Sequence, residues 1–454
     1  MFMGNINGDR RTFFQLLVST LLVSVINFTV WFAITFYVYL QTRSVFATGV
    51  ISGIFLALTA STGIWFGSLV DHHRKKTMMQ VSTVASLVLY AVAFAVYQLT
   101  PKEHFTDPSS VALWTLVLLL MFGVIAGNIR TIALPTMVTL LVEEESRGRA
   151  NGLVGTTTGV TFLVTSVISG VLVAVGDMFW VLVLALAVLT VAVGHLSLVP
   201  VREPAPAAGT TRSSVDLRGT VRVIRGVPGL MALIVFSAFN NLLGGVFMAL
   251  MDAYGLSLVS VQAWGLLWGV LSTGFIVGGL LVSRTGLGAN PVRLLLAVNL
   301  LLWTVTLLFP VRSSILLLTA GMYVYMLFVP YAEAAEQTIL QKVVPYQRQG
   351  RVFGFAQSVE QAASPLTAFL ISPVAQFVFI PFMTDGAGAR AVGDWFGRGP
   401  DRGLALVFML VGAIGIVATV AALRSRPYRR LSERYAEPEP AAAPPVAAAE
   451  EVMT

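Results

Sequence analysis

Ionisable residues stand inside several long apolar runs of the sequence. Glu333 and Glu336 lie three residues apart in one run and therefore on one face of a helix, and Glu360 lies in the next run. Arg130 and Asp252 each lie in an earlier run. A charge within a membrane span costs ~2.5–3.5 kcal/mol on insertion scales, so these residues are candidates for proton coupling or substrate contact. The alternatives are side chains that reach back to the membrane interface and, for Asp252, a place at the outer boundary.

Polar and aromatic side chains in the same runs form a second group of candidates. The first run carries Thr20, Ser24, Asn27 and Trp31 at helical spacing. Such side chains can line a cavity, or they can bond between packed helices for a modest gain in stability. The cavity-lining candidates are Asn27, Phe28, Trp31, Asn240, Asn241, Tyr331, Gln357 and Gln361.

The amino-acid composition indicates an integral membrane protein. Of 454 residues, 56% are hydrophobic and only 11% are charged, and the mean hydropathy is +0.82. Twenty or so apolar residues span a bilayer as a helix, and the chain has room for about twelve such spans.

The absence of cysteine excludes disulfides, thiolate metal sites and cysteine nucleophiles, and the four histidines form no metal-ligand cluster. We find no phosphate-binding loop and no nucleophile with a base, so we expect neither an enzyme nor a cofactor.

The apolar runs are interrupted once, at residues 200–228. About six spans precede this stretch and about six follow it. Its first part reads as a linker, and its second part places Leu217, Val221 and Ile224 on one face with arginines on the other, which predicts a basic amphipathic helix at the membrane surface. A solvated loop is the alternative. The predicted units are residues 1–199, 200–228 and 229–424, followed by a disordered cytoplasmic tail at 425–454.

Basic residues fix the predicted topology. Most of the 29 lysines and arginines fall in loops on one side of the membrane, together with both termini. The positive-inside rule places that side in the cytoplasm. The net charge of +7 reports this topology, so we do not expect nucleic acid as a partner. The opposite side has only Arg43, Lys102, Arg312, Arg390, Arg398 and Arg402.

An internal repeat relates the two halves. Residues 141–152 align without a gap with residues 343–354, so that Gly148, Arg149 and Gly152 match Gly350, Arg351 and Gly354. Each stretch precedes the fifth span of its half. Transporters are often built from two such halves, with the substrate site near the bilayer midplane where the halves meet.

The loop from Gly67 to Lys76, GSLVDHHRKK, resembles the signature loop of the major facilitator superfamily. SRGRANG, RQGRVFG and the run from Leu340 to Pro345 resemble the macrolide-efflux-type branch of drug:proton antiporters, a branch that is similar to siderophore exporters. Four features depart from the family pattern: Arg74 replaces the second Gly, His72 replaces the usual Arg, the second half lacks the Asp, and the fifth span has no Pro. The gating-motif candidates are Gly67, Asp71, Arg74, Lys75, Arg149 and Arg351.

The resemblance implies an all-α integral membrane fold of about twelve transmembrane helices in two pseudo-twofold-related six-helix bundles. Spans one, four, seven and ten would line the central cavity. Asp71 would accept amide hydrogens from the start of the eleventh span, near Gly350 and Arg351, and close the cytoplasmic side. Since Arg130 aligns with Ala332, we expect Arg130 to pair with Glu333 or Glu336 across the cavity.

These features predict a secondary active transporter that exports amphipathic drugs or related small molecules in exchange for protons. Its driving force would be the proton gradient, and it would act as a monomer in a bacterial inner or plasma membrane. One alternative is an exporter of an endogenous metabolite such as a siderophore or lipid. An alternative of another class is a sensor or scaffold on a transporter fold that moves no substrate.

Overall fold

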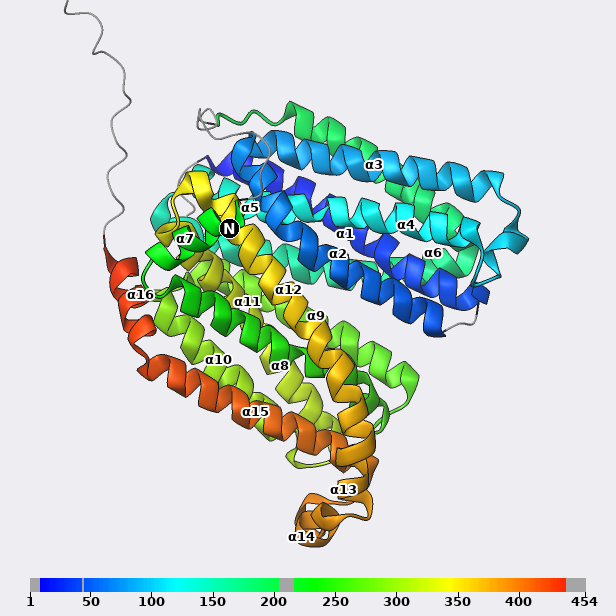
Figure 1. Cartoon of the computed structure of the whole chain (residues 1–454), viewed down its shortest axis with the longest axis vertical. Coiled ribbons are helices and arrows are strands. Elements are labelled where there is room, and N and C mark those ends of the chain that lie inside the picture. Colours follow the sequence, from blue (N-terminus) through cyan, green and yellow to red (C-terminus); the bar gives the residue numbers. More distant parts are fainter. Residues whose placement is uncertain (1–8, 43–44, 204–215, 438–454) are drawn as a thin grey trace, which may run out of the picture.

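The computed structural model describes residues 9–42, 45–203 and 216–437, and these residues form helices packed into two bundles (Figure 1). The first bundle contains α1 (Arg10–Thr42), α2 (Val45–His72), α3 (Lys75–Leu99), α4 (Val111–Ala126), α5 (Asn128–Leu141) and α6 (Glu144–Leu198). The second contains α8 (Leu230–Leu256), α9 (Val261–Thr285), α10 (Pro291–Leu308), α11 (Ile315–Val343), α12 (Gln349–Val374) and α15 (Pro400–Arg424). Shorter helices are α7 (Leu217–Gly226), α13 (Ile380–Thr384), α14 (Ala387–Phe396) and α16 (Arg426–Ala436).

Among the described residues, 11 segments are long and apolar enough to cross a membrane. They match eleven of the twelve predicted spans. The predicted fifth span, 150–175, is not among them, and it lies within α6, where most side chains between residues 166 and 177 are outside the described set.

Helix α6 runs across the molecule and back. A straight helix of its 55 residues would be ~80 Å long at 1.5 Å per residue. Yet the residues flanking its two ends both bond near the start of α1: Asp9 N donates to Leu141 O at 2.9 Å, and Thr12 Oγ1 donates to Pro200 O at 3.3 Å. The chain therefore reverses within α6, as the sequence predicted for a fifth and a sixth span.

Two predicted spans are subdivided. The span 111–141 consists of α4 and α5, with a break at Gly127. A Cβ atom at Gly127 would collide with the Asn27 amide group of α1, so glycine lets α1 approach closely at this point. The eleventh span continues from α12 through a π-helical turn, Ala375–Phe379, into α13.

Glycines mark the two crossings between the bundles. At Gly67 of α2, a Cβ atom would collide with the Gly350 carbonyl group at the start of α12. At Gly279 of α9, a Cβ atom would lie 2.5 Å from Thr156 N and 2.7 Å from Gly152 O of α6. The α2–α12 and α6–α9 crossings are thus counterparts, as the repeat of Gly152 and Gly354 indicated.

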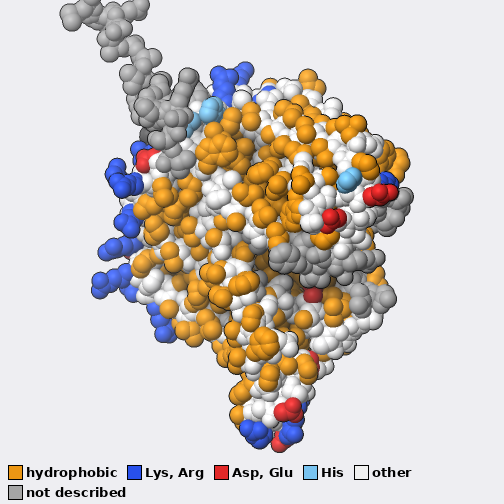
Figure 2. Space-filling model, turned by 45° about the vertical axis from the view of Figure 1, so that its right-hand side comes forward, with side chains coloured by type: hydrophobic (Ala, Val, Ile, Leu, Met, Phe, Trp, Pro, Cys, Tyr) orange, Lys and Arg blue, Asp and Glu red, His pale blue; other side chains and the backbone are white. Residues whose placement is uncertain are grey.

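We call one end of the molecule the basic end. It carries α7, α16, and the loops that join α2 to α3, α5 to α6, α9 to α10 and α11 to α12. Figure 2 shows Lys and Arg side chains gathered along this edge, separated by a broad hydrophobic surface from a charged tip at the far end. The bundles lie closest near α7 and the start of α12, and they diverge toward α13 (Figure 1).

The amphipathic helix predicted after the linker is α7, but its apolar residues do not act as one face. Ile224 is buried against the second bundle together with Thr220, whereas Leu217 is 45% exposed. Asp216 caps the helix by accepting a hydrogen bond from Gly219 N at 2.7 Å.

The prediction of disorder from residue 425 is wrong for its first part, because α16 occupies Arg426–Ala436. Ser425 caps this helix by accepting a hydrogen bond from Tyr428 N at 3.3 Å, and Leu431 is buried. Its apolar side chains fall at helical spacing and pack on the second bundle. This burial of apolar surface stabilises the helix, whereas a solvated tail would bury none. The remainder of the predicted tail, from 438, lies outside the described residues.

The far end of the second bundle is fixed by Arg402, which is buried. Its guanidinium group donates to Pro310 O at 2.7 Å and to Phe396 O at 3.1 Å. Arg402 therefore joins α14 to the connection before α11, which ties residues 382–402 to the second bundle.

Candidate functional site

A cluster of three carboxyl groups is formed by two helices of the second bundle, with Glu333 exposed and Glu336 and Glu360 half-buried. Glu336 of α11 lies against the Ser237 hydroxyl group of α8 and against Glu360 of α12. Glu333, one helical turn before Glu336, is close enough to interact electrostatically with both carboxyl groups. The structure thus brings together three of the predicted coupling residues, although the sequence placed them in different spans.

The cluster has no basic partner among the described residues, and none of its three glutamates forms an ion pair there. The Glu360 Oε1 atom is buried and lacks a hydrogen-bond donor. A buried carboxyl oxygen without a donor is costly unless a proton or a ligand satisfies it. The described residues contain no group of His, Asp and Glu side chains arranged to hold a metal ion. Carboxyl groups of this kind can bind a proton or an organic cation.

The cluster lies at the seam between the bundles, near mid-membrane depth. Glu333 and Glu360 are each ~15 Å from the basic end of their helices at 1.5 Å per residue, about half of a ~30 Å hydrocarbon core. Gln357 lies one turn before Glu360 on the same face of α12. Its Nε2 atom donates to Thr131 Oγ1 of α5 at 3.1 Å, which joins the two bundles.

Arg130 does not pair with Glu333 or Glu336, so that prediction is wrong. Its buried guanidinium group donates to Thr83 Oγ1 at 2.6 Å and, at 3.3 Å each, to Ser19 Oγ, Thr20 Oγ1 and Met79 O. All four partners belong to α1 and α3 of the first bundle. The repeat gave the correct depth, but the Arg130 side chain bonds within the first bundle. The next residue, Thr131, contacts the second bundle through Gln357.

The predicted cavity-lining residues divide into packing contacts and exposed groups. Asn27 Oδ1 accepts from Tyr90 Oη at 2.9 Å, and Asn240 Oδ1 accepts from Trp303 Nε1 at 2.7 Å, so both are committed within a bundle. Asn241 donates to Ser237 O at 3.1 Å, and Tyr331 Oη lies 3.3 Å from Thr285 Oγ1.

The remaining candidates carry accessible aromatic or polar surface. Trp31 stacks on Phe55 with ring centroids 4.0 Å apart. Phe28 is 39% exposed and contacts Phe162, which in turn contacts Phe275 of the second bundle. Gln361 is exposed on the face of α12 that carries Gln357.

Asp252 lies away from the cluster, near the far end of α8. Its Oδ1 atom accepts hydrogen bonds from Trp264 Nε1 at 2.9 Å and from Trp268 Nε1 at 3.1 Å. Both tryptophans belong to α9. Asp252 therefore stabilises the packing of α8 against α9.

The predicted contact of Asp71 with the eleventh span is present. Asp71 Oδ1 accepts from Gly350 N at 2.7 Å, and Oδ2 accepts from Arg351 N at 3.0 Å. Arg351 Nε lies 3.3 Å from the same carboxylate. The carboxylate thus occupies the N-terminal end of α12, where free amide hydrogens and the helix dipole favour a negative charge.

The other motif residues surround this contact. Lys75 is buried, and its Nζ atom lies 5.0 Å from the centroid of the Tyr346 ring in the second bundle. Arg74 is exposed, and Arg149 lies beside Gly286 in the α9–α10 loop. Glu203, at the start of the central linker, accepts from Lys75 N at 2.5 Å and from Lys76 N at 2.7 Å, which ties the linker to α3.

Sequence reasoning missed two further contacts between the bundles. Asn151 Nδ2 donates to Gln341 Oε1 at 2.9 Å, and Gln341 Nε2 donates to Pro135 O at 3.0 Å. Lys342 Nζ forms an ion pair with Glu144 Oε1 at 2.5 Å. Asn151 and Gln341 both lie in or beside the repeated segments, so their position at the seam was the available signal.

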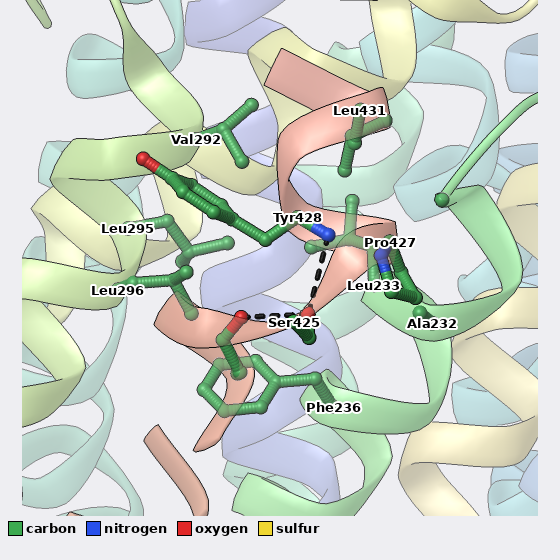
Figure 3. Close-up of a pocket in the computed structure, with 12 residues that line it drawn as sticks. Ala232, Leu233, Phe236, Val292, Leu295, Leu296, Ser425, Pro427, Tyr428 and Leu431 are labelled. Atoms are coloured by element: carbon green, nitrogen blue, oxygen red, sulfur yellow. Dashed lines mark hydrogen bonds between the residues drawn. The ribbon is translucent and has the colours of Figure 1, made fainter. Parts of the chain in front are cut away.

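The hydrogen bonds and ion pairs that join the bundles within the described residues lie in the half of the molecule toward the basic end. The molecule is therefore closed at that end. The apolar cavity between α8, α10 and α16 is separate from the cluster, and its volume of about 40 Å³ is too small for a drug-sized ligand (Figure 3).

Comparison with known proteins gives concordant matches. The family model described as Major Facilitator Superfamily matches residues 16–368. Macrolide efflux protein A of Streptococcus pyogenes is 24% identical over 360 residues, which cover 74% of this chain and 83% of the relative.

Solved structures share the fold at low sequence identity. The human organic anion transporter MFSD10 superposes with a TM-score of 0.70 at 14% identity, covering 94% of this chain and 100% of that chain. A bacterial homologue of the iron transporter ferroportin, in an outward-facing state, gives 0.68 at 14% identity and covers 91% of this chain and 100% of that chain. The proton:xylose symporter XylE gives 0.63 at 13% identity, with 92% and 96% covered.

Proposed function

The chain belongs to the major facilitator superfamily of secondary transporters, and on that premise we propose that it exports amphipathic drugs or related small molecules in exchange for protons. It would do so in the plasma membrane of a bacterium, with the basic end toward the cytoplasm. A superfamily member is a multi-pass membrane protein with a small-molecule substrate and is not an enzyme.

The carboxyl cluster is the observation that carries the proposal. Among the described residues, Glu333, Glu336 and Glu360 share one site without a basic partner, and one carboxyl oxygen there lacks a donor. Such a site can be neutralised by a proton or by a cationic substrate, and binding of one opposes binding of the other. Competition of this kind is what an antiporter requires.

Exchange would follow from opening the two ends in turn. With the basic end closed by the Asp71, Gln341 and Lys342 contacts, a proton from the far side binds the cluster and displaces the substrate. With the basic end open, the proton leaves to the cytoplasm and a substrate binds. The two bundles would rock about the site at their seam.

Aromatic surface supports an amphipathic substrate. Trp31, Phe55, Phe28, Phe162 and Phe275 form two groups of ring contacts on α1, α2, α6 and α9. Flat apolar surface suits a substrate with a large apolar body, and the carboxyl cluster suits a positive charge on it. The efflux activity in the name of the streptococcal relative agrees with export.

The test uses inside-out vesicles that contain the overexpressed protein. An interior-acid pH gradient is followed with a fluorescent probe while macrolides, tetracyclines, cationic dyes and siderophores are added one at a time. We expect at least one compound to collapse the gradient in wild type and in the control Glu103→Gln, whose carboxylate is exposed at the far end, but not in Glu336→Gln.

Other outcomes select among the alternatives. A response to siderophores alone would favour export of an endogenous metabolite. Equal responses in wild type and Glu336→Gln would remove Glu336 from proton coupling. Folded protein that binds a compound yet never moves it would favour a sensor or scaffold.

A further inference from the structure

Helix α16 has two chemically different faces. Tyr428, Leu431 and Tyr435 fall on one face, which packs on the second bundle. Tyr428 and Leu431 line the small cavity between α8 and α10 (Figure 3). Gly229 adopts a φ of 81°, and a Cβ atom there would collide with Pro427 O, so a glycine lets α16 approach this closely. Ser432 Oγ accepts a hydrogen bond from Asn290 Nδ2 at 2.7 Å.

The packed face reaches the contact that joins the two bundles. Lys342 Nζ lies 4.5 Å from the centroid of the Tyr435 ring and 2.5 Å from Glu144 Oε1 of the first bundle. The Tyr435 ring and the Glu144 carboxylate therefore both lie beside the Lys342 ammonium group. Burial, with the nearby Glu144 carboxylate, raises the pKa of Tyr435 to about 12, so its hydroxyl group stays neutral.

The opposite face presents arginines. Arg426, Arg429 and Arg430 are exposed, and none has an acidic partner within residues 9–42, 45–203 and 216–437. The helix begins directly after the last span, which places these arginines at the level of the lipid headgroups. A polybasic segment next to a span attracts anionic lipids.

We propose that α16 is a lipid-dependent clamp: anionic phospholipid headgroups bind its face of Arg426, Arg429 and Arg430, and through Tyr435 this holds the Lys342–Glu144 pair together. The basic end then stays closed more of the time in an anionic membrane. The proposal rests on the alternate opening of the two ends that the proposed function requires.

The test measures distance and needs no substrate, so it stands whether or not transport is found. Because the chain has no cysteine, Thr77→Cys in α3 and Ala421→Cys in α15 give two unique and exposed spin-label sites on different bundles. The distance between the two spin labels is measured by double electron–electron resonance. The protein is placed in nanodiscs of phosphatidylcholine alone or of phosphatidylcholine with phosphatidylglycerol. We expect phosphatidylglycerol to raise the ratio of closed to open molecules by about threefold or more.

Variants assign the effect. The triple variant R426Q/R429Q/R430Q should lose the lipid dependence, and the matched variant R218Q/R222Q/R225Q in α7 should keep it. Tyr435→Ala should lower the closed fraction in both lipids, while Tyr435→Phe, which keeps the ring, should not.

Three results would overturn the proposal. The lipid response could survive in the α16 variant or be lost only in the α7 variant. Soluble glycerol phosphate could reproduce the response in phosphatidylcholine discs, which would point to a free anion. Tyr435→Ala could leave the closed fraction unchanged in a protein that remains folded.

Discussion

The Asp71 carboxylate accepts a hydrogen bond of 2.7 Å from the Gly350 amide group, although 279 residues separate the two in the chain. A second bond from Arg351 N and the Arg351 side chain surround the same carboxylate. Hydrogen bonds to a charged group contribute ~1.5–3 kcal/mol each, so this contact alone can bias an equilibrium between two conformations by a factor of ten or more.

Asp71→Asn should therefore open the basic end. The amide removes the charge and leaves one acceptor oxygen for two backbone donors. We expect the ratio of closed to open molecules to fall about tenfold, measured by the distance between labels at Thr77→Cys and Ala421→Cys. Asp107→Asn, an exposed carboxylate at the far end, should leave the ratio unchanged. An unaltered ratio in Asp71→Asn would show that other contacts hold this end closed.

The close approach of α2 and α12 gives a second prediction, with a control on the same helix. A Cβ atom at Gly67 would collide with Gly350 O, whereas one at Gly53 would meet no described atom within 4 Å. Gly67→Ala should separate α2 from α12 and weaken the Asp71 contact, so that transport slows and the basic end opens. Gly53→Ala should behave like wild type in both measurements. Equal behaviour of the two variants would contradict the role given to the crossing.

Features that depend on local sequence patterns could be predicted. The spans followed from apolar runs, and the Asp71 contact followed from a motif and a repeat that name both of its sides. The pairing of Glu333 with Glu336 on one face followed from their spacing of three residues. Local periodicity does not give the rotation of one helix against another, and for that reason the meeting of Glu336 with Ser237 and Glu360 could not be derived.

Arg130 and α16 show where inference from sequence fails for a physical reason. The repeat fixed the depth of Arg130, but it did not show which neighbouring helices its side chain would bond to. Serine and threonine partners on α1 and α3 leave no distinctive pattern in a membrane sequence. In α16, the polar composition suggested disorder, while three apolar side chains at helical spacing were enough to hold the helix on the bundle.

Asp252 gives a third prediction. Its carboxylate is committed to the indole groups of Trp264 and Trp268, and it lies apart from the carboxyl cluster. Asp252→Ala should lower the unfolding free energy by ~1–3 kcal/mol, because two indole donors lose their acceptor. Proton-coupled transport, measured as collapse of a pH gradient, should persist in the variant once corrected for protein amount. Loss of coupling in a folded variant would return Asp252 to the proton pathway.

Arg130 and Glu336 give a fourth prediction, tested by a double-mutant cycle. Arg130→Gln should destabilise the protein, because Ser19, Thr20 and Thr83 lose a buried donor, and Glu336→Gln should act independently in the other bundle. The coupling free energy between the two changes in thermal unfolding should lie within ~0.5 kcal/mol of zero. The pair Thr131→Val and Gln357→Leu is the positive control: these two side chains hydrogen-bond across the bundles and should couple by ~0.5–1.5 kcal/mol. A coupling free energy above ~1 kcal/mol for Arg130 and Glu336 would mean that the two residues meet in another conformation. The ion pair predicted from the sequence would then form in a different state of the transport cycle.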